Sequence, residues 1–341
     1  MIKSIRRSLA ALLCMLLCFS VLTACADSSL TELEENPVAL AEYAAAKGSQ
    51  TALSADTADL AAEASALTTA SAALPQKITA VASGVYVREN DSALIDYSNA
   101  SEGYVMVQYK QPSTQRLKVQ VKGPATTYTY NLTAEQWVSL PLSDGNGNYK
   151  ITVYRNVSGS KYASVLSLST KVELQDEFAP FLHSNQYVDF DAAPKTVEKA
   201  AELTKDLSVP LEKVAAVYDY VVKNTTYDRK LAATVKSGYL PVLDEVLEKK
   251  SGICFDYAAL MTGMLRSQDI PCKLVVGYAG QAYHAWISVW SAETGWIDGA
   301  IYFNGSSWQR MDPTFASSAK SSKAIMAYIG DGKNYSAKYF Y

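Results

Sequence analysis

Residues 252–278 read GICFDYAALMTGMLRSQDIPCKLVVGY, a lone cysteine that runs into a helical pattern and then into a strand pattern. Apolar side chains recur three and four residues apart on one face: Tyr257, Leu260, Met261, Met264 and Leu265. This spacing predicts a helix that begins at Cys254 and ends before Pro271, with Ser251 and Gly252 as its cap. Unpaired backbone N–H groups and the helix dipole would then lie around Cys254 and lower the pKa of its thiol.

A reactive thiolate needs a neighbouring group that accepts a proton and becomes a stabilising cation. The chain has two histidines, and one of them, His284, opens the strand-like run HAWISVW 30 residues after Cys254. An imidazole needs a third group to fix its orientation, and Asp312 follows 28 residues later in WQRMDPT. The three residues are therefore candidates for a catalytic triad. Taken singly, each also has a structural interpretation: a buried thiol, a core histidine and the start of an Asp-Pro turn.

Helical and strand patterns surround this core. Apolar residues at helical spacing follow Pro210, which suits a first helical position: Val214, Val217, Tyr218, Val221 and Val222. A second helix is predicted near 241–249, and strand-like runs follow the third helix: CKLVVGYA, HAWISVW, WIDGAIYF and WQRMDPT. Helices followed by a sheet predict an α+β domain.

Three separated segments, GICFDYAALMTGMLRSQDIPCKLVVGY, YHAWISVW and WQRMDPTF, resemble the core of the bacterial transglutaminase-like superfamily, which is related to papain-like cysteine peptidases. The resemblance spans about 210–318. It implies a papain-like or transglutaminase-like fold, with helices packed on an antiparallel sheet. It also implies that Cys254 is the nucleophile, His284 the histidine and Asp312 the acid of a cysteine enzyme.

Other thiols and acids near these motifs fit the triad less well. We interpret Cys272 as a small strand hydrophobe rather than a second catalytic thiol, although a disulfide to the nucleophile would switch the enzyme off. Glu293 and Asp298 are predicted on a loop and lack the Met-Asp-Pro setting of the motif acid. His183 has no partner motif, so we interpret it as a structural or surface residue.

The oxyanion hole is only half defined by the sequence. The backbone N–H of Cys254 is a natural donor, and Tyr227 or Asn224 could supply a second, with nothing in the spacing to choose between them. Histidines and cysteines are scattered, and no alternating-aspartate loop occurs, so neither a zinc nor a calcium site is predicted. We expect the activity to need no cofactor.

Residues 1–24 read as an export signal, with Lys3, Arg6 and Arg7 before an apolar run that is short for a bilayer span. The run ends in Leu-Thr-Ala-Cys, which resembles the bacterial lipobox. That resemblance implies lipidation of Cys25, including palmitate, and an anchor on the extracytoplasmic face of the cell membrane. A plain secretory signal is the alternative.

Four further segments follow the signal. Residues 25–76 are rich in Ala, Ser and Thr and predict a tether, with a short coiled-coil or packing helix as the alternative. Residues 77–174 predict a β-sandwich of the immunoglobulin-like kind, 175–193 a linker, and 194–341 the transglutaminase-like domain.

The sandwich prediction depends on a period of two. LKVQVK, TYTYNL and YKITVY alternate apolar and polar residues, so each strand should bury one face and expose the other. SDGNGN at 143–148 is a turn signal between two such runs. The many tyrosines could form a binding face, but cross-strand packing is the more ordinary role.

Composition excludes several classes of protein. A chain of 341 residues with 49% hydrophobic residues is long and apolar enough for two domains with real cores. Five cysteines, three of them in or beside the signal, exclude a disulfide framework. Removing the signal's three positive charges from a net charge of −3 leaves about −6, which argues against a nucleic-acid partner.

The sequence therefore predicts a membrane-anchored enzyme that forms a thioester with an extracellular or cell-wall protein or peptide. Water would resolve the thioester in a peptidase or amidase, and a lysine amine would resolve it in a cross-linking enzyme. Hydrolysis is favoured, because no acceptor-amine site is identified and many bacterial members of the family are classed as predicted cysteine proteases. The alternative from another class is an inactive surface lipoprotein that binds or adheres through its sandwich.

Overall fold

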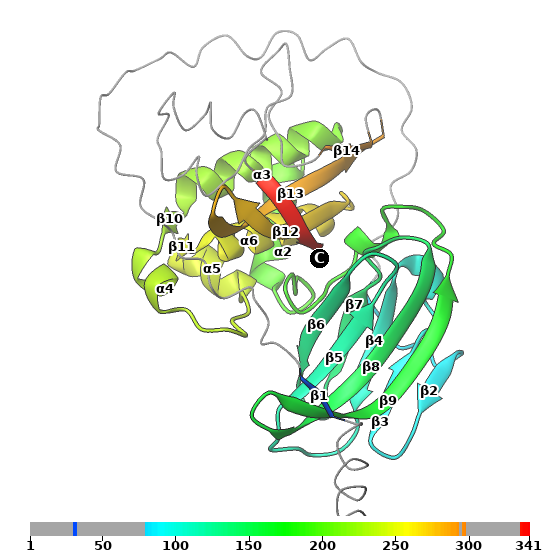
Figure 1. The fold of residues 1–341 in the computed structure, drawn as a ribbon. Helices are drawn as coiled ribbons and strands as arrows, with labels where there is room; N and C mark the ends of the chain where they lie inside the picture. The colour runs from blue at the N-terminus through cyan, green and yellow to red at the C-terminus, as the bar shows by residue number, and fades with distance from the viewer. Residues whose placement is uncertain (1–29, 33–78, 293–294, 298–334) are drawn as a thin grey trace, which may run out of the picture.

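The computed structural model describes residues 30–32, 79–292, 295–297 and 335–341. A strand-rich region lies toward the N-terminal end of these residues, and a region of helices and strands follows it (Figure 1). This confirms the predicted fold class, α+β with a strand-rich part before the helical part.

The strand-rich region consists of two antiparallel sheets. Its strands are β1 (Leu30–Glu32), β2 (Val87–Glu89), β3 (Ala93–Asp96), β4 (Tyr104–Tyr109), β5 (Leu117–Lys122), β6 (Thr127–Leu132), β7 (Trp137–Pro141), β8 (Gly147–Ser158) and β9 (Lys161–Val172). One sheet has the order β1-β9-β8-β5-β6 and the other β2-β3-β4-β7. Apolar side chains of both sheets, such as Val107 and Val119, belong to one buried core, as expected for a sandwich.

The predicted alternation holds only in part, because β4 and β8 each bury four successive residues and β5 buries Lys118. In β5 the side chains of Leu117, Val119 and Val121 are buried as expected, but Lys118 is also fully buried. Its Nζ lies 5.5 Å from the centre of the Tyr162 ring, so an aromatic face covers the lysine on the outer side of the sheet.

Two segments outside the predicted sandwich also contact the folded regions. Strand β1 lies in the stretch predicted as a tether, and it pairs with the edge of β9, Thr31 opposite Tyr162. The stretch predicted as a linker, 175–193, holds a short 3₁₀ helix, η4 (Ala179–Phe181), and several buried apolar side chains. It packs between the two regions of the molecule.

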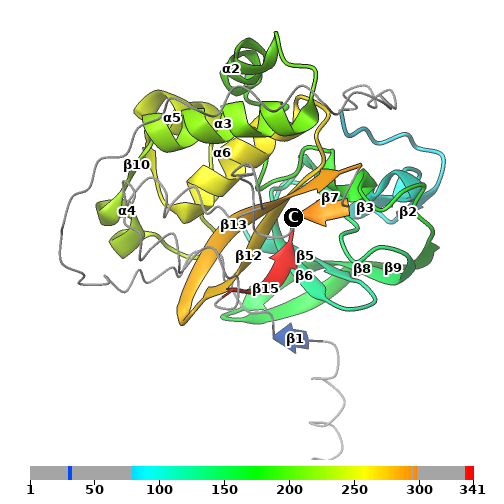
Figure 2. The same cartoon turned by 90° about the horizontal axis from the view of Figure 1, so that it is seen from above.

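The second region packs helices on an antiparallel sheet. The helices are α2 (Pro194–Thr204), α3 (Pro210–Asn224), α4 (Arg229–Thr234), α5 (Leu243–Lys249) and α6 (Cys254–Arg266). The sheet has the order β14-β13-β12-β15, with β12 (Cys272–Ala279), β13 (Ala282–Ser291), β14 (Gly295–Ile297) and β15 (Tyr335–Phe340). Helices α2, α3 and α5 surround α6, which packs on β12 and β13 (Figure 2).

Helix α6 is the centre of this region. All of its residues are buried, and its apolar side chains join the core with those of α3, α5, β12 and β13. Burying a Leu or Met side chain stabilises a fold by about 1.5–3 kcal/mol, so α6 fixes the arrangement of the elements around it. Its last residue, Arg266, is fully buried and donates to the carbonyl oxygens of Cys272, His183 and Tyr341.

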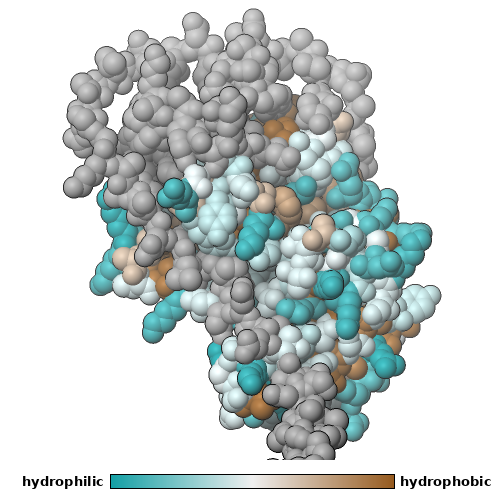
Figure 3. All heavy atoms as spheres, viewed as in Figure 1, coloured by the Kyte–Doolittle hydropathy of each residue, from teal (hydrophilic) through white to brown (hydrophobic). Residues whose placement is uncertain are grey.

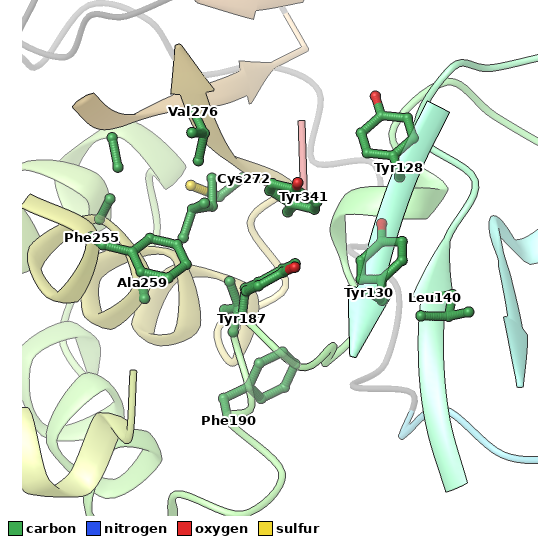
Figure 4. Packing of buried hydrophobic residues seen from close by; sticks show 14 of the residues in the cluster. Tyr128, Tyr130, Leu140, Tyr187, Phe190, Phe255, Ala259, Cys272, Val276 and Tyr341 are labelled. Atoms are coloured by element: carbon green, nitrogen blue, oxygen red, sulfur yellow. The ribbon is translucent and has the colours of Figure 1, made fainter. Parts of the chain in front are cut away.

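A cluster of tyrosines joins the two regions (Figure 4). Tyr187 and Tyr341 lie between Phe255 of α6 and Tyr130 of β6. The centre of the Tyr187 ring is 5.7 Å from those of Tyr130 and Phe255, and 4.4 Å from that of Tyr341. We call Tyr128, Tyr130, Tyr187, Tyr339 and Tyr341 the tyrosine cluster. Tyr128 and Tyr130 of the sandwich are thus packed side chains, as the more ordinary interpretation predicted.

On the face seen in Figure 3, the described surface is largely hydrophilic or intermediate, with apolar side chains in small groups. No helix in the described part of the chain combines the length and the apolar character needed to cross a membrane.

Candidate active site

Cys254 is the first residue of α6, as predicted, and only 3% of its surface is exposed. The predicted cap is wrong. Ser251 and Gly252 form a two-residue strand, β11, and the extended residue Ile253 is the N-cap. The cap comes from inside the helix, because the Asp256 carboxylate accepts a hydrogen bond from the Ile253 N–H at 2.8 Å.

Asp256 holds the start of α6 through a buried network. Its other carboxylate oxygen accepts a hydrogen bond from the Tyr239 hydroxyl at 2.7 Å. Burial raises the pKa of Asp256 to about 6, although these two hydrogen bonds act in the opposite direction. A Cβ at Gly252 would lie 2.5 Å from the Asp256 Cβ, so the network also needs glycine at that position.

The segment before Cys254 is held by β10 (Thr226–Tyr227), which pairs in parallel with β11. Tyr227 lies opposite Gly252, and the Asp228 N–H donates to the Gly252 carbonyl at 2.9 Å. Tyr227, one of the two predicted oxyanion donors, is therefore next to the strand that leads into the nucleophile. The amide of the other, Asn224, donates to the Tyr220 carbonyl within its own helix at 2.8 Å.

His284 lies on β13, opposite Gly277 of β12, and is 5% exposed. Side chains alternate along a strand, so His284 and Trp286 share one face, and their ring centres are 6.4 Å apart with nearly parallel planes. A Cβ at Gly277 would lie 2.9 Å from Cη2 of Trp286. Glycine at 277 therefore lets Trp286 lie close to the sheet beside the histidine.

The backbones of Cys254 and His284 lie at the same end of the α6–β12–β13 unit, although the His284 side chain is on the face of β13 opposite to the one that packs on α6. The other end is fixed where Arg266, the last residue of α6, donates through Nε to the carbonyl of Cys272, the first residue of β12, at 2.9 Å. Strand β12 then returns along the helix. Its hairpin with β13, at Gly280 and Gln281, is consequently at the end where the helix begins.

Four predicted or considered residues lie outside the described part of the chain. These are the motif acid Asp312, the lipidation candidate Cys25, and the two acids Glu293 and Asp298. The structure therefore places the thiol and the imidazole of the predicted triad, and the acid stays a prediction.

The second thiol is buried away from the first. The Cys272 thiol is fully buried, its Sγ is 3.6 Å from the Thr262 hydroxyl oxygen, and burial raises its pKa to about 12. Thr262 lies eight residues after Cys254 in α6, which is about 12 Å along a helix axis. A disulfide needs Cα atoms within about 7 Å, so a Cys254–Cys272 bond would require the helix to rearrange. Both are free thiols in this structure.

His183 is structural, one of the two predicted alternatives. It is buried, its Nε2 lies 3.1 Å from the Glu102 carbonyl oxygen, and its ring centre is 4.5 Å from that of Tyr104. In the described ranges of the chain, His, Cys, Asp and Glu side chains form no group of three that could hold a metal ion.

Sequence patterns do not single out Tyr283, which precedes His284. Its hydroxyl is buried and has no hydrogen-bond partner among the residues that the structure describes. Nothing in the tripeptide Tyr-His-Ala marks this side chain. It becomes noticeable only when the strand's two faces are assigned, because Tyr283 then faces α6.

Comparison with known proteins covers part of this chain. This chain is 28% identical over 178 residues to the uncharacterized protein YebA of Bacillus subtilis. The aligned residues cover 46% of this chain and 24% of YebA. This chain is 30% identical over 119 residues to a protein-glutamine gamma-glutamyltransferase of Pseudomonas aeruginosa, 30% of this chain and 17% of that protein. The chain thus spans a quarter or less of the length of these two relatives.

Among solved structures, the periplasmic domain of TgpA from Pseudomonas aeruginosa superposes with a TM-score of 0.32 and 16% identity, over 71% of this chain and 99% of that one. Residues 197–313 match the family model of the Transglutaminase-like superfamily. The matched stretch begins in α2, includes α3, α5 and α6, and extends through the sheet strands that hold His284. The part of the chain that positions Cys254 and His284 is therefore a domain of the transglutaminase-like superfamily.

Proposed function

We propose that the chain is a membrane-anchored extracytoplasmic cysteine enzyme that breaks an amide or peptide bond through a thioester on Cys254. The Sγ of the thiolate attacks the carbonyl carbon, and the π electrons of the carbonyl move to its oxygen. When this intermediate collapses, the C–N bond breaks and the amine leaves with a proton from the His284 imidazolium. Asp312 orients the imidazole.

Water completes the cycle. His284 removes a proton from a water molecule as its oxygen attacks the thioester carbon, and the C–S bond then breaks. A carboxylic acid leaves, and the thiolate and imidazolium are restored. A lysine amine that attacked in place of water would give an isopeptide bond, and the protein would then be a cross-linking enzyme.

The position of Cys254 carries this proposal. The thiol is nine-tenths or more buried at the first residue of a helix, where unpaired N–H groups and the helix dipole favour an anion. The capping carboxylate of Asp256 is engaged by Ile253 and Tyr239. The match of residues 197–313, which include both Cys254 and His284, to the transglutaminase-like family model supports the proposal.

The rate at which iodoacetamide alkylates Cys254 tests the proposal. The reduced full chain and its His284→Ala variant are labelled from about pH 4 to about pH 9, and the labelled residue is identified by mass spectrometry. We expect fast labelling that persists below about pH 6 and is lost in the variant, because an ion pair with imidazolium keeps the thiol ionised. Cys272 is the internal control, since burial raises its pKa to about 12.

Labelling that rises only near the ordinary thiol pKa of about 8.5, in both proteins alike, would contradict an activated nucleophile. Three substrates then separate the reaction classes: cell-wall peptides, a denatured protein, and a glutamine donor with a fluorescent amine. We expect cleavage of one of the first two. Amine incorporation without cleavage would replace the peptidase proposal by the cross-linking one.

The membrane anchor is proposed from the lipobox-like sequence at Cys25. Radiolabelled palmitate fed to cells that express the chain should label the full chain and not a Cys25→Ser variant. Release of the unaltered chain into the medium without label would contradict the anchor.

A binding lipoprotein that uses the sandwich is the second candidate, and one feature favours it. A hollow of about 430 Å³ on the five-stranded sheet is lined by Lys122, Lys150 and Lys171, together with Gly123, Asn148, Tyr149, Ser169 and Thr170. Lys122 lies directly opposite Lys150, an arrangement of like charges that an anionic ligand would relieve. A Cys254→Ala variant that kept the full biological effect would favour this candidate.

A further inference from the structure

Tyr283 lies beside His284 on β13, but its side chain is on the other face of the strand. Successive side chains alternate, so Tyr283 shares its face with Ala285 and Ile287, which belong to the core that includes α6. Tyr283 is the second residue of β13, at the hairpin end of the strand, and α6 begins toward that end (Figure 2). Its ring is therefore on the side of the sheet where Cys254 begins the helix.

The surroundings of the Tyr283 ring agree with this position. Burial first, and then negative charge on Tyr339, Tyr278, Tyr187 and Cys254, in that order, disfavours ionisation of the Tyr283 phenol and raises its pKa. Tyr187 in turn packs on Phe255, the residue after Cys254, with ring centres 5.7 Å apart. On its other side the Tyr283 ring stands edge-on to Tyr278, with ring centres 5.4 Å apart. The ring is held between the tyrosine cluster, the hairpin and the helix start.

The Tyr283 hydroxyl is buried, and the described residues offer it neither a donor nor an acceptor within hydrogen-bonding distance. Buried polar groups in proteins are nearly always paired, so an unpaired one needs an explanation. Burial above all, and then the neighbouring phenols and Cys254, raise the pKa of Tyr283 well above its ordinary value. The phenol therefore keeps its proton throughout the working range of a cysteine enzyme and is available as a donor.

We propose that the Tyr283 hydroxyl donates a hydrogen bond to the carbonyl oxygen of the substrate attacked by Cys254, as the second oxyanion-hole donor beside the Cys254 N–H. This inference rests on the proposed acyl-transfer function. The donor is preorganised, because its ring is packed on several sides and its hydroxyl needs to release no other partner. As the carbonyl oxygen becomes negative, the hydrogen bond strengthens, and the proton stays on the phenol oxygen throughout.

Two reagents separate an oxyanion donor from a residue that activates the thiol. Iodoacetamide alkylates a thiolate by displacement at a saturated carbon, so no oxyanion forms. p-Nitrophenyl acetate acylates the same thiolate through a tetrahedral oxyanion and releases nitrophenolate. Both rate constants are measured on the reduced full chain, on Tyr283→Phe and on Cys254→Ala, with the modified residue identified by mass spectrometry.

We expect Tyr283→Phe to lower the acylation rate constant about 10²-fold, the usual effect of losing one oxyanion donor, while alkylation stays within about twofold. Tyr278→Phe is the matched control, because it removes a phenol oxygen from the ring that contacts Tyr283 but is 41% exposed. It should change neither rate constant. Loss of both reactions in Cys254→Ala confirms that they report on this thiol.

Three other results would contradict the donor role of Tyr283 or the proposed function. Unchanged acylation in Tyr283→Phe would overturn the donor role and leave the proposed function standing. A parallel fall in both rate constants would also overturn it, since Tyr283 would then act on the thiol or on the local fold. If Cys254 of the unaltered chain reacted with neither reagent faster than a free thiol does, the proposed function would be overturned. The donor role of Tyr283 would then be overturned as well.

Discussion

Asp256 holds the start of α6 through a buried carboxylate whose pKa is raised. Its carboxylate accepts from Ile253 and Tyr239, and its pKa is raised by burial from 3.8 to about 6. The native state then binds the proton more tightly than the unfolded chain does. The free energy of unfolding should therefore fall as the pH rises from about 4 to about 6, by roughly 3 kcal/mol in total.

Asp256→Asn removes this titration, so we expect its free energy of unfolding to lack the fall between about pH 4 and about pH 6 that the unaltered chain shows. Urea unfolding at several pH values, followed by tryptophan fluorescence, measures both curves. Tyr239→Phe removes a hydrogen bond that lowers the pKa of Asp256, so in this variant the fall should extend to higher pH. Parallel curves for the unaltered chain and Asp256→Asn would contradict the assignment.

Among single residues, the candidate nucleophile was easier to predict than the residues that hold it in place. Cys254 at a helix start followed from apolar spacing, whereas the cap did not, because Ser251 and Gly252 are engaged by β10. The usable signal was Asp256 at the third helical position, where an acid can reach back to the N-cap. Tyr283 carried no signal, since its unpaired hydroxyl depends on which face of β13 meets α6.

Gly277 determines how two strands and one ring meet beside His284. A Cβ at this position would lie 2.1 Å from the Ser336 carbonyl oxygen of β15 and 2.9 Å from Cη2 of Trp286. Gly277→Ala should therefore displace β15 from β12 and lower the free energy of unfolding by about 1–3 kcal/mol, as for other overpacked sites. Acylation of Cys254 should slow as well, because the ring that lies against His284 moves.

Urea unfolding and the p-nitrophenyl acetate rate constant measure the two effects of Gly277→Ala. Ser336→Ala is the control, since it shortens an exposed side chain of the same strand and adds no atom near residue 277. A Gly277→Ala protein as stable and as reactive as the unaltered chain would show that β15 can shift without cost.

Elements with strong periodicity were predicted well. Helices α3 and α6 begin at Pro210 and Cys254 as expected, and β12 covers CKLVVGYA in full. Helix α2 was not singled out, although Pro194 at its start was a usable signal. Strand β15 was not predicted, because its partner β12 lies more than 50 residues earlier in the chain and nothing local to YSAKYF indicates that pairing.

At the scale of the molecule, the sandwich and the transglutaminase-like domain share one core. Alternation predicted that one face of TYTYNL is buried, and Tyr128 and Tyr130 are indeed buried. It could not predict that they meet Tyr187 and Tyr341, because a strand pattern identifies a buried face without identifying its partner. The stretch predicted as a linker supplies the central ring of this contact.

This shared core predicts that the two regions unfold together. Tyr187 is fully buried and touches a ring from β6, a ring beside Cys254, and Tyr341. Tyr187→Ala should lower the free energy of unfolding by about 3–5 kcal/mol, as for other large aromatic truncations. Hydrogen exchange followed by mass spectrometry should show faster opening of both β5 and α6, because the ring supports both regions.

Tyr130→Phe is the matched control for the tyrosine cluster. It keeps the ring and removes a fully buried hydroxyl that lacks a partner among the described residues. Removing an unpaired buried polar atom should leave the free energy of unfolding within about 1 kcal/mol of its original value, or raise it.

If Tyr187→Ala accelerated hydrogen exchange in α6 and left exchange in β5 unchanged, the tyrosine cluster would stabilise only the helical region. The sandwich would then be free to move relative to Cys254, and a substrate bound on one region would not be held in place for the other.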